Sequence, residues 1–230
     1  VLFGEYEILG VLGAGGMGEV YRARHRGLGS HRAIKVMHPD LSNNAGAGEY
    51  FKREAEALLR VRHPAVVFCH DLLSSAGSEY LIMEMVEGES LSRRMAAGPL
   101  STQEVLTLGA RLAGGLAAAH AKGVVHRDLS PDNVVLPGGR LEEAKLIDFG
   151  IAKIVTPGGG TIVDGFKGKF TYASPEQLWF GTDVDGRSDL YSLGLLLAAA
   201  ALGRPLPMGA NVAEAIRARK AFANLPEEVP

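Results

Sequence analysis

The sequence predicts an α+β protein with two lobes: a small five-stranded lobe that carries one helix, and a larger, mainly helical lobe. Three observations predict this fold class. Short β-rich segments bounded by turn residues dominate the beginning of the chain, one amphipathic helical segment interrupts them, and long apolar segments with helix-capping residues follow. We expect residues 1–85 to form the small lobe and residues 86–230 the larger lobe of a single domain.

The strands of the small lobe are predicted by β-rich or alternating segments that end at turn residues. The first segment runs into a glycine-rich stretch, the second meets Gly27 and Gly29, and the third ends before Pro39. Two further segments follow after the helix of this lobe. The five predicted strands are residues 6–12, 19–24, 32–37, 65–73 and 80–85.

One helix is predicted between the third and fourth strands. Residues 42–48 are rich in glycine and asparagine, so we expect a loop there. Residues 50–61 then carry apolar side chains at helical spacing, with charged residues opposite. The apolar face consists of Phe51, Ala55, Leu58 and Leu59.

The larger lobe is predicted to be mainly helical. Ser101 and Glu104 have capping-box spacing and open a long helix to about residue 122, where Gly123 is the predicted C-cap. Ser188 and Asp189 are predicted to cap a second helix that runs through the apolar residues up to position 202. A third helix is expected over about residues 212–221, and short strands are expected beside two motifs described below.

Composition excludes several classes of protein. The 230 residues are 47% hydrophobic and 22% charged, and the net charge of −2 provides no basic field for nucleic acid or for an anionic membrane. Cys69 is the only cysteine, so no intramolecular disulfide can form, and we expect it to be a small buried core residue. The longest apolar stretch is shorter than the ~20 residues that span a bilayer. No signal peptide is visible, and we expect a cytoplasmic segment, with any membrane anchor outside it.

A glycine-rich segment is the first chemical motif. Residues 13–20, Gly-Ala-Gly-Gly-Met-Gly-Glu-Val, fit the pattern G-x-G-x-x-G-x-V, in which glycines allow backbone N–H groups to approach phosphate oxygens. A dinucleotide-binding turn requires a helix after the glycines, whereas here a strand follows. A phosphate-covering hairpin therefore fits better, although a plain glycine-rich loop would also satisfy the pattern.

A lysine within a predicted strand is the second motif. Lys35 lies seventeen positions after Gly18, between apolar residues. It is either a lysine on an edge or facing solvent, or a cation for the α- and β-phosphates of a nucleotide that is held by a carboxylate of the following helix. Glu54 and Glu56 are the candidates, and Glu54 is preferred because it neighbours the apolar face through Leu58.

Two loops carry the strongest signal. His126-Arg127-Asp128 is followed by Asn133, five positions after the aspartate, and Asp148-Phe149-Gly150 begins fifteen positions later. These segments match the catalytic loop and the metal-binding loop of protein kinases. Asp128 would accept or orient the proton of a substrate hydroxyl. Asn133 and Asp148 would supply the oxygen ligands that Mg²⁺ prefers.

With these motifs in order, the chain resembles the bacterial branch of the eukaryotic-like serine/threonine protein kinases over residues 6–204. The resemblance implies a two-lobed protein kinase fold, Mg²⁺ (or Mn²⁺) and ATP as cofactors, and serine or threonine hydroxyls of proteins, including its own, as substrates. It implies no nucleic-acid partner and no membrane contact from this segment. Further matching segments are residues 51–55 (Phe-Lys-Arg-Glu-Ala), 63–64, 80–84, 174–177 (Ser-Pro-Glu-Gln) and 185–194.

The resemblance also implies a nucleotide site. Met83 would be the gatekeeper, Glu84 and Val86 would offer hinge backbone groups to adenine, and Asp189 would bond the backbone of the catalytic loop. Three apolar side chains, Val20, Ala33 and Val135, would sandwich the adenine ring. The complete implied set is Leu12, Gly13, Ala14, Gly15, Gly16, Met17, Gly18, Val20, Ala33, Lys35, Met83, Glu84, Val86 and Val135.

Two residues depart from the pattern of the family. Many members have lysine two positions after the catalytic aspartate and threonine in the substrate-facing loop, whereas this chain has Ser130 and Lys169. One hypothesis is a functional exchange, in which Lys169 supplies the cation and Ser130 the hydroxyl beside Asp128. The alternative is that Ser130 marks a weakened or inactive kinase and that Lys169 faces solvent.

The resemblance further implies regulation through Arg127, which in the family pairs with a phosphate on the activation loop. Thr156, Thr161 and Thr171 are the threonines between Asp148 and Pro175. Thr161 beside the flexible glycines is the preferred autophosphorylation site, Thr156 is a second candidate, and Thr171 is assigned to the substrate-facing wall.

The family usually continues for several helices beyond residue 221, so the larger lobe is expected to be incomplete. In the family, Glu176 pairs with an arginine of a later helix, and no clear counterpart is visible here. Two other functions stay open: a catalytically weak or inactive nucleotide-binding module with a signalling role, and a kinase for small molecules. The loop before Ser174-Pro175-Glu176 favours a protein substrate over a small one.

Overall fold

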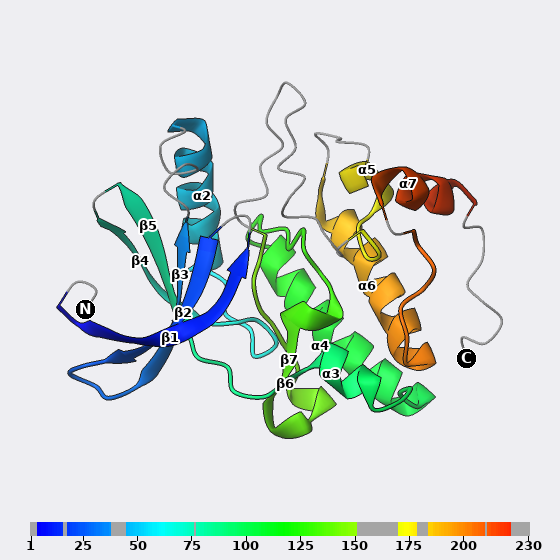
Figure 1. The fold of residues 1–230 in the computed structure, drawn as a ribbon, viewed down its shortest axis with the longest axis horizontal. Helices are drawn as coiled ribbons and strands as arrows, with labels where there is room; N and C mark the ends of the chain where they lie inside the picture. The colour runs from blue at the N-terminus through cyan, green and yellow to red at the C-terminus, as the bar shows by residue number, and fades with distance from the viewer. Residues whose placement is uncertain are drawn as a thin grey trace. The chain divides into compact units, whose positions relative to one another are not determined.

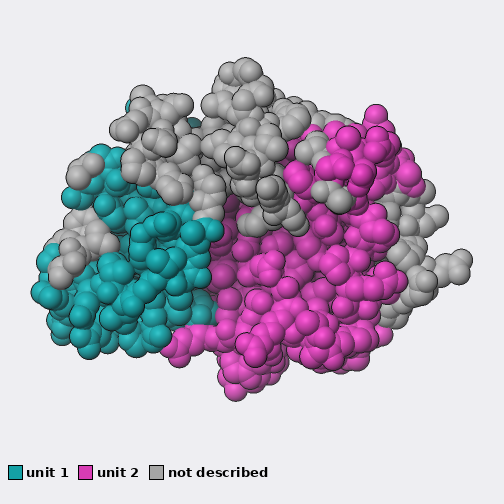
Figure 2. Space-filling view, viewed as in Figure 1, with its two compact units in different colours: residues 1–62, 67–86, 151–154 teal, residues 63–66, 87–150, 155–230 magenta. Residues whose placement is uncertain are grey.

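A computed structural model describes the chain over several ranges. The sequence divides into two units, and each is described by itself (Figure 2). Of the described residues, unit 1 contains those of ranges 4–62 and 67–86, and unit 2 contains 63–66 and those from 87 onward. The described residues are 4–15, 18–37, 45–75, 77–150, 170–178, 184–209 and 211–221.

Unit 1 is built on one antiparallel sheet of five strands, in the order β1-β2-β3-β5-β4 (Figure 1). Its strands include all five predicted ones, so the predicted composition of this lobe is confirmed. β3 lies at the centre of the sheet, flanked by β2 and β5. The bounds are β1 Tyr6–Gly15, β2 Gly18–His25, β3 His31–Met37, β4 Cys69–Ser75 and β5 Ser78–Glu84.

The helix of unit 1, α2 (Ala45–Leu58), packs against β4 and β5. Its predicted apolar face is buried at Phe51, Ala55 and Leu58. The predicted start at residue 50 was wrong, because the backbone is already helical from Ala45 and includes part of the stretch expected to be a loop. After Leu58 the backbone N–H groups of Arg60 and Val61 donate to carbonyls three residues earlier, as in a 3₁₀ turn. The α-helix therefore ends before the expected residue 61.

A cluster of buried apolar side chains lies on the sheet itself. Tyr6, Ala23, Ile34 and Ile82 form a buried cluster from four strands or strand ends. The thiol of Cys69 is fully buried, and burial raises its pKa to about 12. Cys69 is therefore the small core residue that the sequence predicts, not a reactive thiol.

The predicted fourth strand was wrong in its first residues. Ala65 and Val66 do not extend β4 but belong to unit 2, where the N–H of Leu146 donates to the carbonyl of Ala65 at 2.8 Å and Val66 forms a parallel bridge with Leu146. Apolar character alone cannot distinguish a strand of one sheet from a segment that pairs elsewhere.

Unit 2 is mainly helical, as predicted. α4 (Thr102–His120) and α6 (Gly186–Leu202) pack against each other, and Gly109 permits their close approach, since a Cβ there would lie 3.1 Å from Leu197. α6 is buried over most of its surface, which its apolar sequence predicts. Two shorter helices, α3 (Leu91–Ala96) and α5 (Pro175–Leu178), were not predicted.

The ends of these helices test the capping predictions. Ser101 and Glu104 form the predicted capping box of α4, and Gly203 ends α6 with a left-handed backbone. The predicted cap of α6 by Ser188 and Asp189 was wrong. Asp185 is the N-cap instead, and its side chain accepts the N–H of Arg187.

Three short strands complete unit 2 in a small antiparallel sheet of order β6-β7-β8. They are β6 (Glu89–Ser90), β7 (Val134–Leu136) and β8 (Lys145–Leu146), and the last two are the short strands expected beside the chemical motifs. The helix α7 (Val212–Ala221) has the predicted bounds and contacts α5. None of the helices in the described ranges is both long and apolar enough to cross a membrane.

Candidate active site

The glycine-rich segment forms the hairpin between β1 and β2. The strands pair in antiparallel register from Tyr6 opposite His25 to Gly15 opposite Gly18, so a strand follows the glycines as the sequence predicts. Gly18 has φ +149°, and a Cβ at this position would lie 1.9 Å from the carbonyl oxygen of Val36. Gly16 and Met17 lie outside the described residues.

Lys35 lies on the central strand of unit 1, opposite Val20 on one side and Leu81 on the other. Only 7% of its surface is exposed, so the alternative that Lys35 is an edge or solvent-facing lysine was wrong. On α2, Glu54 is buried whereas Glu56 is exposed. A buried cation and a buried carboxylate therefore occur in the same unit, on the two elements that the sequence proposes.

The residues expected to contact adenine in unit 1 lie on β1, β2, β3 and β5 or directly after it. Ala33 and Met83 are register partners and both are buried, whereas Leu12 is exposed. The N–H of Glu84 donates to the carbonyl of Phe68 at 2.8 Å, and the Glu84 carboxylate accepts the N–H of Phe68 at 2.7 Å. The backbone N–H of Glu84 is therefore occupied within the protein.

In unit 2, a buried carboxylate holds the loop of His126-Arg127-Asp128. Asp189 of α6 is 1% exposed and accepts the N–H groups of His126 at 2.8 Å and Arg127 at 2.9 Å. The backbone of Arg127 has φ +60°, which is uncommon for a residue with a side chain. The two hydrogen bonds hold this strained conformation directly before Asp128.

The imidazole of His126 joins this loop to the Asp148-Phe149-Gly150 segment. Its Nε2–H donates to the carbonyl of Ile147 at 3.1 Å, its ring lies 4.4 Å from the ring of Phe149, and its own carbonyl accepts the N–H of Gly150 at 2.7 Å. Burial lowers the pKa of His126, which keeps the ring neutral. The neutral ring lets Nδ1 accept the N–H of Asp128 at 3.3 Å.

Asn133 is joined to Asp128 by a backbone contact. Its Nδ2 donates to the Asp128 carbonyl at 2.7 Å, which only the NH₂ end of the amide can do, so its Oδ1 is the atom left for a ligand. Asp148 has φ +54°, a second strained backbone in this region. Among the described residues no group of three or more histidine, cysteine or acidic side chains is arranged to hold a metal ion by itself. Oxygen donors from an amide and a carboxylate fit Mg²⁺, which keeps waters and phosphate oxygens as its other ligands.

Ser130 follows two positions after Asp128. It is 4% exposed, and its Oγ has no hydrogen-bond partner within the described part of the chain. A buried hydroxyl without a hydrogen-bond partner is costly, because it has lost its contact with water. Lys169, Thr156 and Thr161 all lie outside the described residues.

Two side chains whose roles were not predicted support the loop. Gln177 of α5 donates from Nε2 to the carbonyl of Arg127 at 2.8 Å and accepts the N–H and the hydroxyl of Ser174. The Nε2 of His120, at the end of α4, lies 2.7 Å from a carboxylate oxygen of Asp189. The only sequence signal for Gln177 was its place in Ser-Pro-Glu-Gln, and His120 had none.

Glu176 also has a partner that was not predicted. Its carboxylate accepts the hydroxyl of Ser188 from α6. No ion pair between Glu176 and an arginine occurs among the described residues, although the buried Arg219 of α7 contacts the segment just before it. Ser188 is therefore engaged in a tertiary contact, which explains why it does not cap α6.

Fold and site together define a protein kinase domain. The sequence pattern described as "Protein kinase domain" matches residues 6–227, and the chain therefore belongs to this family. The adjacent His-Arg-Asp and Asp-Phe-Gly segments of unit 2 are those that the family uses.

The relatives are bacterial serine/threonine-protein kinases. The chain is 47% identical over 216 residues to serine/threonine-protein kinase pkn2 of Myxococcus xanthus, covering 90% of this chain and 26% of the relative. It is 35% identical to PknD of Mycobacterium tuberculosis, covering 88% of this chain and 30% of that protein. The chain thus spans about a quarter to a third of the length of these curated relatives.

A solved structure of the PknI kinase domain of Mycobacterium tuberculosis is also similar. It matches with a TM-score of 0.70 at 33% identity, over 89% of this chain and 77% of the PknI chain. The predicted two-lobed kinase fold and the predicted bacterial serine/threonine kinase family are both confirmed.

Proposed function

We propose that this domain transfers the γ-phosphoryl group of ATP to serine or threonine hydroxyls of proteins. The observation that carries the proposal is the arrangement in unit 2, where the backbone before Asp128 is held strained by Asp189 and Asn133 is bonded to the Asp128 carbonyl. Such a rigid catalytic loop is what a reaction governed by positioning and charge requires.

Each residue of the proposed site has a chemical role. Asp128 orients the substrate hydroxyl and accepts its proton. The Oδ1 of Asn133 and the carboxylate of Asp148 hold Mg²⁺, which supplies neutralisation of the phosphate charge when it is bound. In unit 1, Lys35 binds the α- and β-phosphates, and Glu54 keeps Lys35 in place.

The adenine ring is assigned to the apolar side chains of Val20, Ala33 and Val135, with Met83 as gatekeeper. We assign backbone groups of Glu84 and Val86 to adenine. The glycine-rich hairpin, which includes Gly13 and Gly15, covers the phosphates through its N–H groups.

A phosphotransfer assay tests this function. We expect the chain to transfer label from γ-labelled ATP to casein and to itself, with Thr161 the main labelled residue of the segment between Asp148 and Pro175. Loss of a general base typically lowers a rate by about 10²–10⁴, so Asp128→Asn should lower transfer by that factor while leaving ATP binding intact.

The same assay separates the alternatives. Binding of MgATP without transfer to any protein would establish an inactive nucleotide-binding module. Transfer to an aminoglycoside or another small hydroxyl compound, but not to casein, would establish a small-molecule kinase. Transfer to casein that Asp128→Asn leaves unchanged would contradict the proposed site.

We also propose that Lys169 and Ser130 have exchanged the cation and the hydroxyl beside Asp128. The buried Oγ of Ser130 supports this, because it has no hydrogen-bond partner among the described residues and a buried hydroxyl requires a polar partner. Loss of a donor that stabilises developing charge costs about 10²–10³ in rate, so we expect Lys169→Met to reduce phosphotransfer by that factor.

Lys167→Met is the matched control, two positions earlier in the same segment, and should leave the rate unchanged. A double variant that combines Lys169→Thr with Ser130→Lys should recover most of the activity, because it restores the lysine and the threonine at the positions usual in the family. Equal activity of Lys169→Met and Lys167→Met would refute the exchange.

A further inference from the structure

We propose that Arg219 of α7 is a positioning residue that holds residues 170–173 as a preformed wall for the protein substrate. The inference deepens the proposed kinase function and rests on it. It assigns a role to a side chain that no sequence motif singled out.

Arg219 donates hydrogen bonds to the backbone carbonyls of the wall. Its Nη2 donates to the carbonyl of Phe170 at 2.5 Å, that of Thr171 at 3.0 Å and that of Ala173 at 2.9 Å, and its Nε lies 3.3 Å from the carbonyl of Ala173. Its Nη1 donates to the carbonyl of Met208 at 2.8 Å and lies 3.4 Å from that of Ala215. One guanidinium thus ties the wall to the segment before α7.

The position of this guanidinium is unusual for a charge. Arg219 is 7% exposed, and no carboxylate pairs with it in the described ranges. Burial lowers its pKa, and the hydroxyl of Tyr191 on α6 is its one side-chain partner there. A buried cation is costly unless its donors are satisfied, so the carbonyls of the wall are its main compensation.

Apolar packing supports the same contact. Ala173 and Leu178 form a buried cluster with Ala215 of α7, and Phe170 and Ile216 pack against it. The arginine therefore does not bridge an open gap. It fixes the backbone carbonyls of a segment whose side chains already pack on α7.

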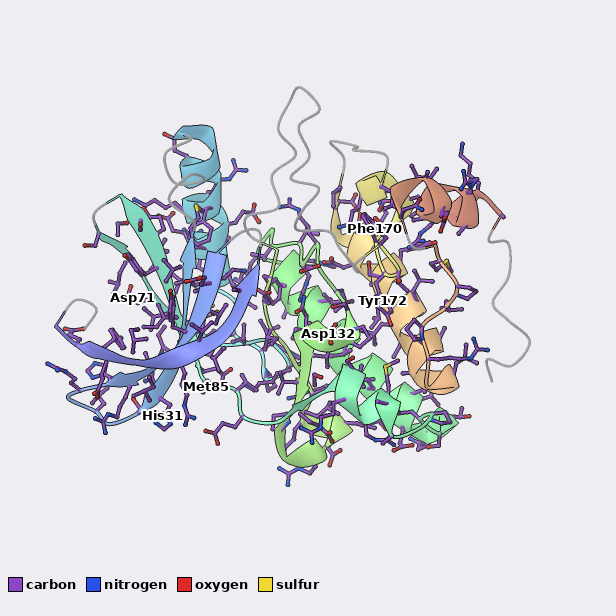
Figure 3. The ribbon with its side chains drawn as sticks, viewed as in Figure 1. His31, Asp71, Met85, Asp132, Phe170 and Tyr172 are labelled. Carbon is purple, nitrogen blue, oxygen red and sulfur yellow. The ribbon has the colours of Figure 1, made fainter. Side chains whose placement is uncertain are left out.

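The wall borders the catalytic loop. Ser174 continues it and is bound by Gln177, whose Nε2 donates to the carbonyl of Arg127, the residue before Asp128. Burial, and then the charge of Asp132 in the catalytic loop, raise the pKa of Tyr172 to about 12. Tyr172 and Asp132 lie in the same part of unit 2 in Figure 3. A substrate hydroxyl that reaches Asp128 must therefore approach beside this wall.

The test is Arg219→Lys in the full chain. Lysine keeps the charge and much of the stem, but its donors sit on a single nitrogen and cannot span these carbonyls. Arg217→Lys is the matched control, because Arg217 lies on the same helix and is exposed. The measurements are KM and kcat for casein, KM for MgATP, and hydrogen exchange of peptides covering 170–178.

We expect Arg219→Lys to raise KM for casein about tenfold, as for loss of a charge-assisted hydrogen bond, with KM for MgATP unchanged and faster exchange in 170–178. Arg217→Lys should change none of these. An unaltered KM for casein, or a lower kcat with both KM values unchanged, would overturn the inference, because a merely stabilising arginine changes only the amount of folded enzyme.

Arg219→Met is a second variant that removes the charge. It should weaken casein phosphorylation further, and if it does not fold, Arg219→Lys decides. Failure of the proposed function is distinguishable, because the unsubstituted chain would then phosphorylate no protein. In that case hydrogen exchange still tests the role of Arg219. If Arg219→Lys does not change the exchange rate of residues 170–178, Arg219 does not hold this segment.

Discussion

Gly18 illustrates how a single position can be constrained by the sheet as well as by a ligand. Its φ of +149° disfavours any side chain, and a Cβ would lie 1.9 Å from the Val36 carbonyl oxygen. At Gly13 a Cβ would meet nothing within 4 Å. The third glycine of the motif is therefore required by the pairing of β2 with β3, independently of phosphate.

We expect Gly18→Ala to lower the Tm. Backbone strain of this kind costs about 1–3 kcal/mol, or roughly 2–12 °C in a protein of this size. Gly13→Ala should change the Tm by less than about 2 °C and serves as the control in thermal unfolding without nucleotide. Equal melting of the two variants would show that the close approach to Val36 relaxes freely.

At the same scale, residue types that suit a helix cap do not show whether their side chains form the cap. Ser188 and Asp189 have the composition of a helix cap, yet they bind Glu176 and the catalytic loop. The cap passes to Asp185. Side chains engaged in tertiary hydrogen bonds thus leave the cap to a neighbouring residue.

Among the elements, α4 is the one whose start the sequence predicts best. The hydroxyl of Ser101 accepts the N–H of Glu104, and the Glu104 carboxylate accepts the N–H of Ser101 at 2.8 Å. All atoms of this motif lie within four residues, so tertiary contacts do not decide it. α2 shows the opposite case, because its first turns lack such a signal.

Ser101→Ala should destabilise the protein by about 1 kcal/mol, which corresponds to a fall in Tm of roughly 2–4 °C. Gln103→Ala, an exposed neighbour on the same helix, should have little effect. Thermal unfolding at neutral pH measures both. A Ser101→Ala variant as stable as Gln103→Ala would mean that water replaces the cap at no cost.

The same pair predicts a pH dependence. Hydrogen bonds from Ser101 lower the pKa of Glu104 below its usual 4.5. A carboxylate with a depressed pKa stabilises the folded state above its unfolded pKa, and this contribution is lost as pH falls through the folded value. The difference in Tm between the unsubstituted chain and Glu104→Gln should therefore shrink below about pH 4.5, because the variant lacks the carboxylate that titrates.

At the scale of the whole molecule, membership of the two units follows contacts rather than sequence order. Residues 63–66 precede β4 in the chain but belong to unit 2, because Ala65 and Val66 pair with Leu146. Nothing in a short apolar run specifies which of two partners it will choose. Such a choice is made by long-range pairing.

The sequence by itself determined the fold class, the central strand with Lys35, the helix with Glu54, the capping box of α4 and the loops with Asp128, Asn133 and Asp148. These features depend on local periodicity or on fixed spacing within a few residues. The bond from Asp189 to the backbone of the catalytic loop was expected, but only the tertiary structure decided that Arg127 in this loop is strained, that Gln177 reaches its carbonyl and that Arg219 binds the wall. These contacts join residues 46 to 62 positions apart, and no local pattern encodes which distant carbonyl or N–H group a buried polar side chain will satisfy.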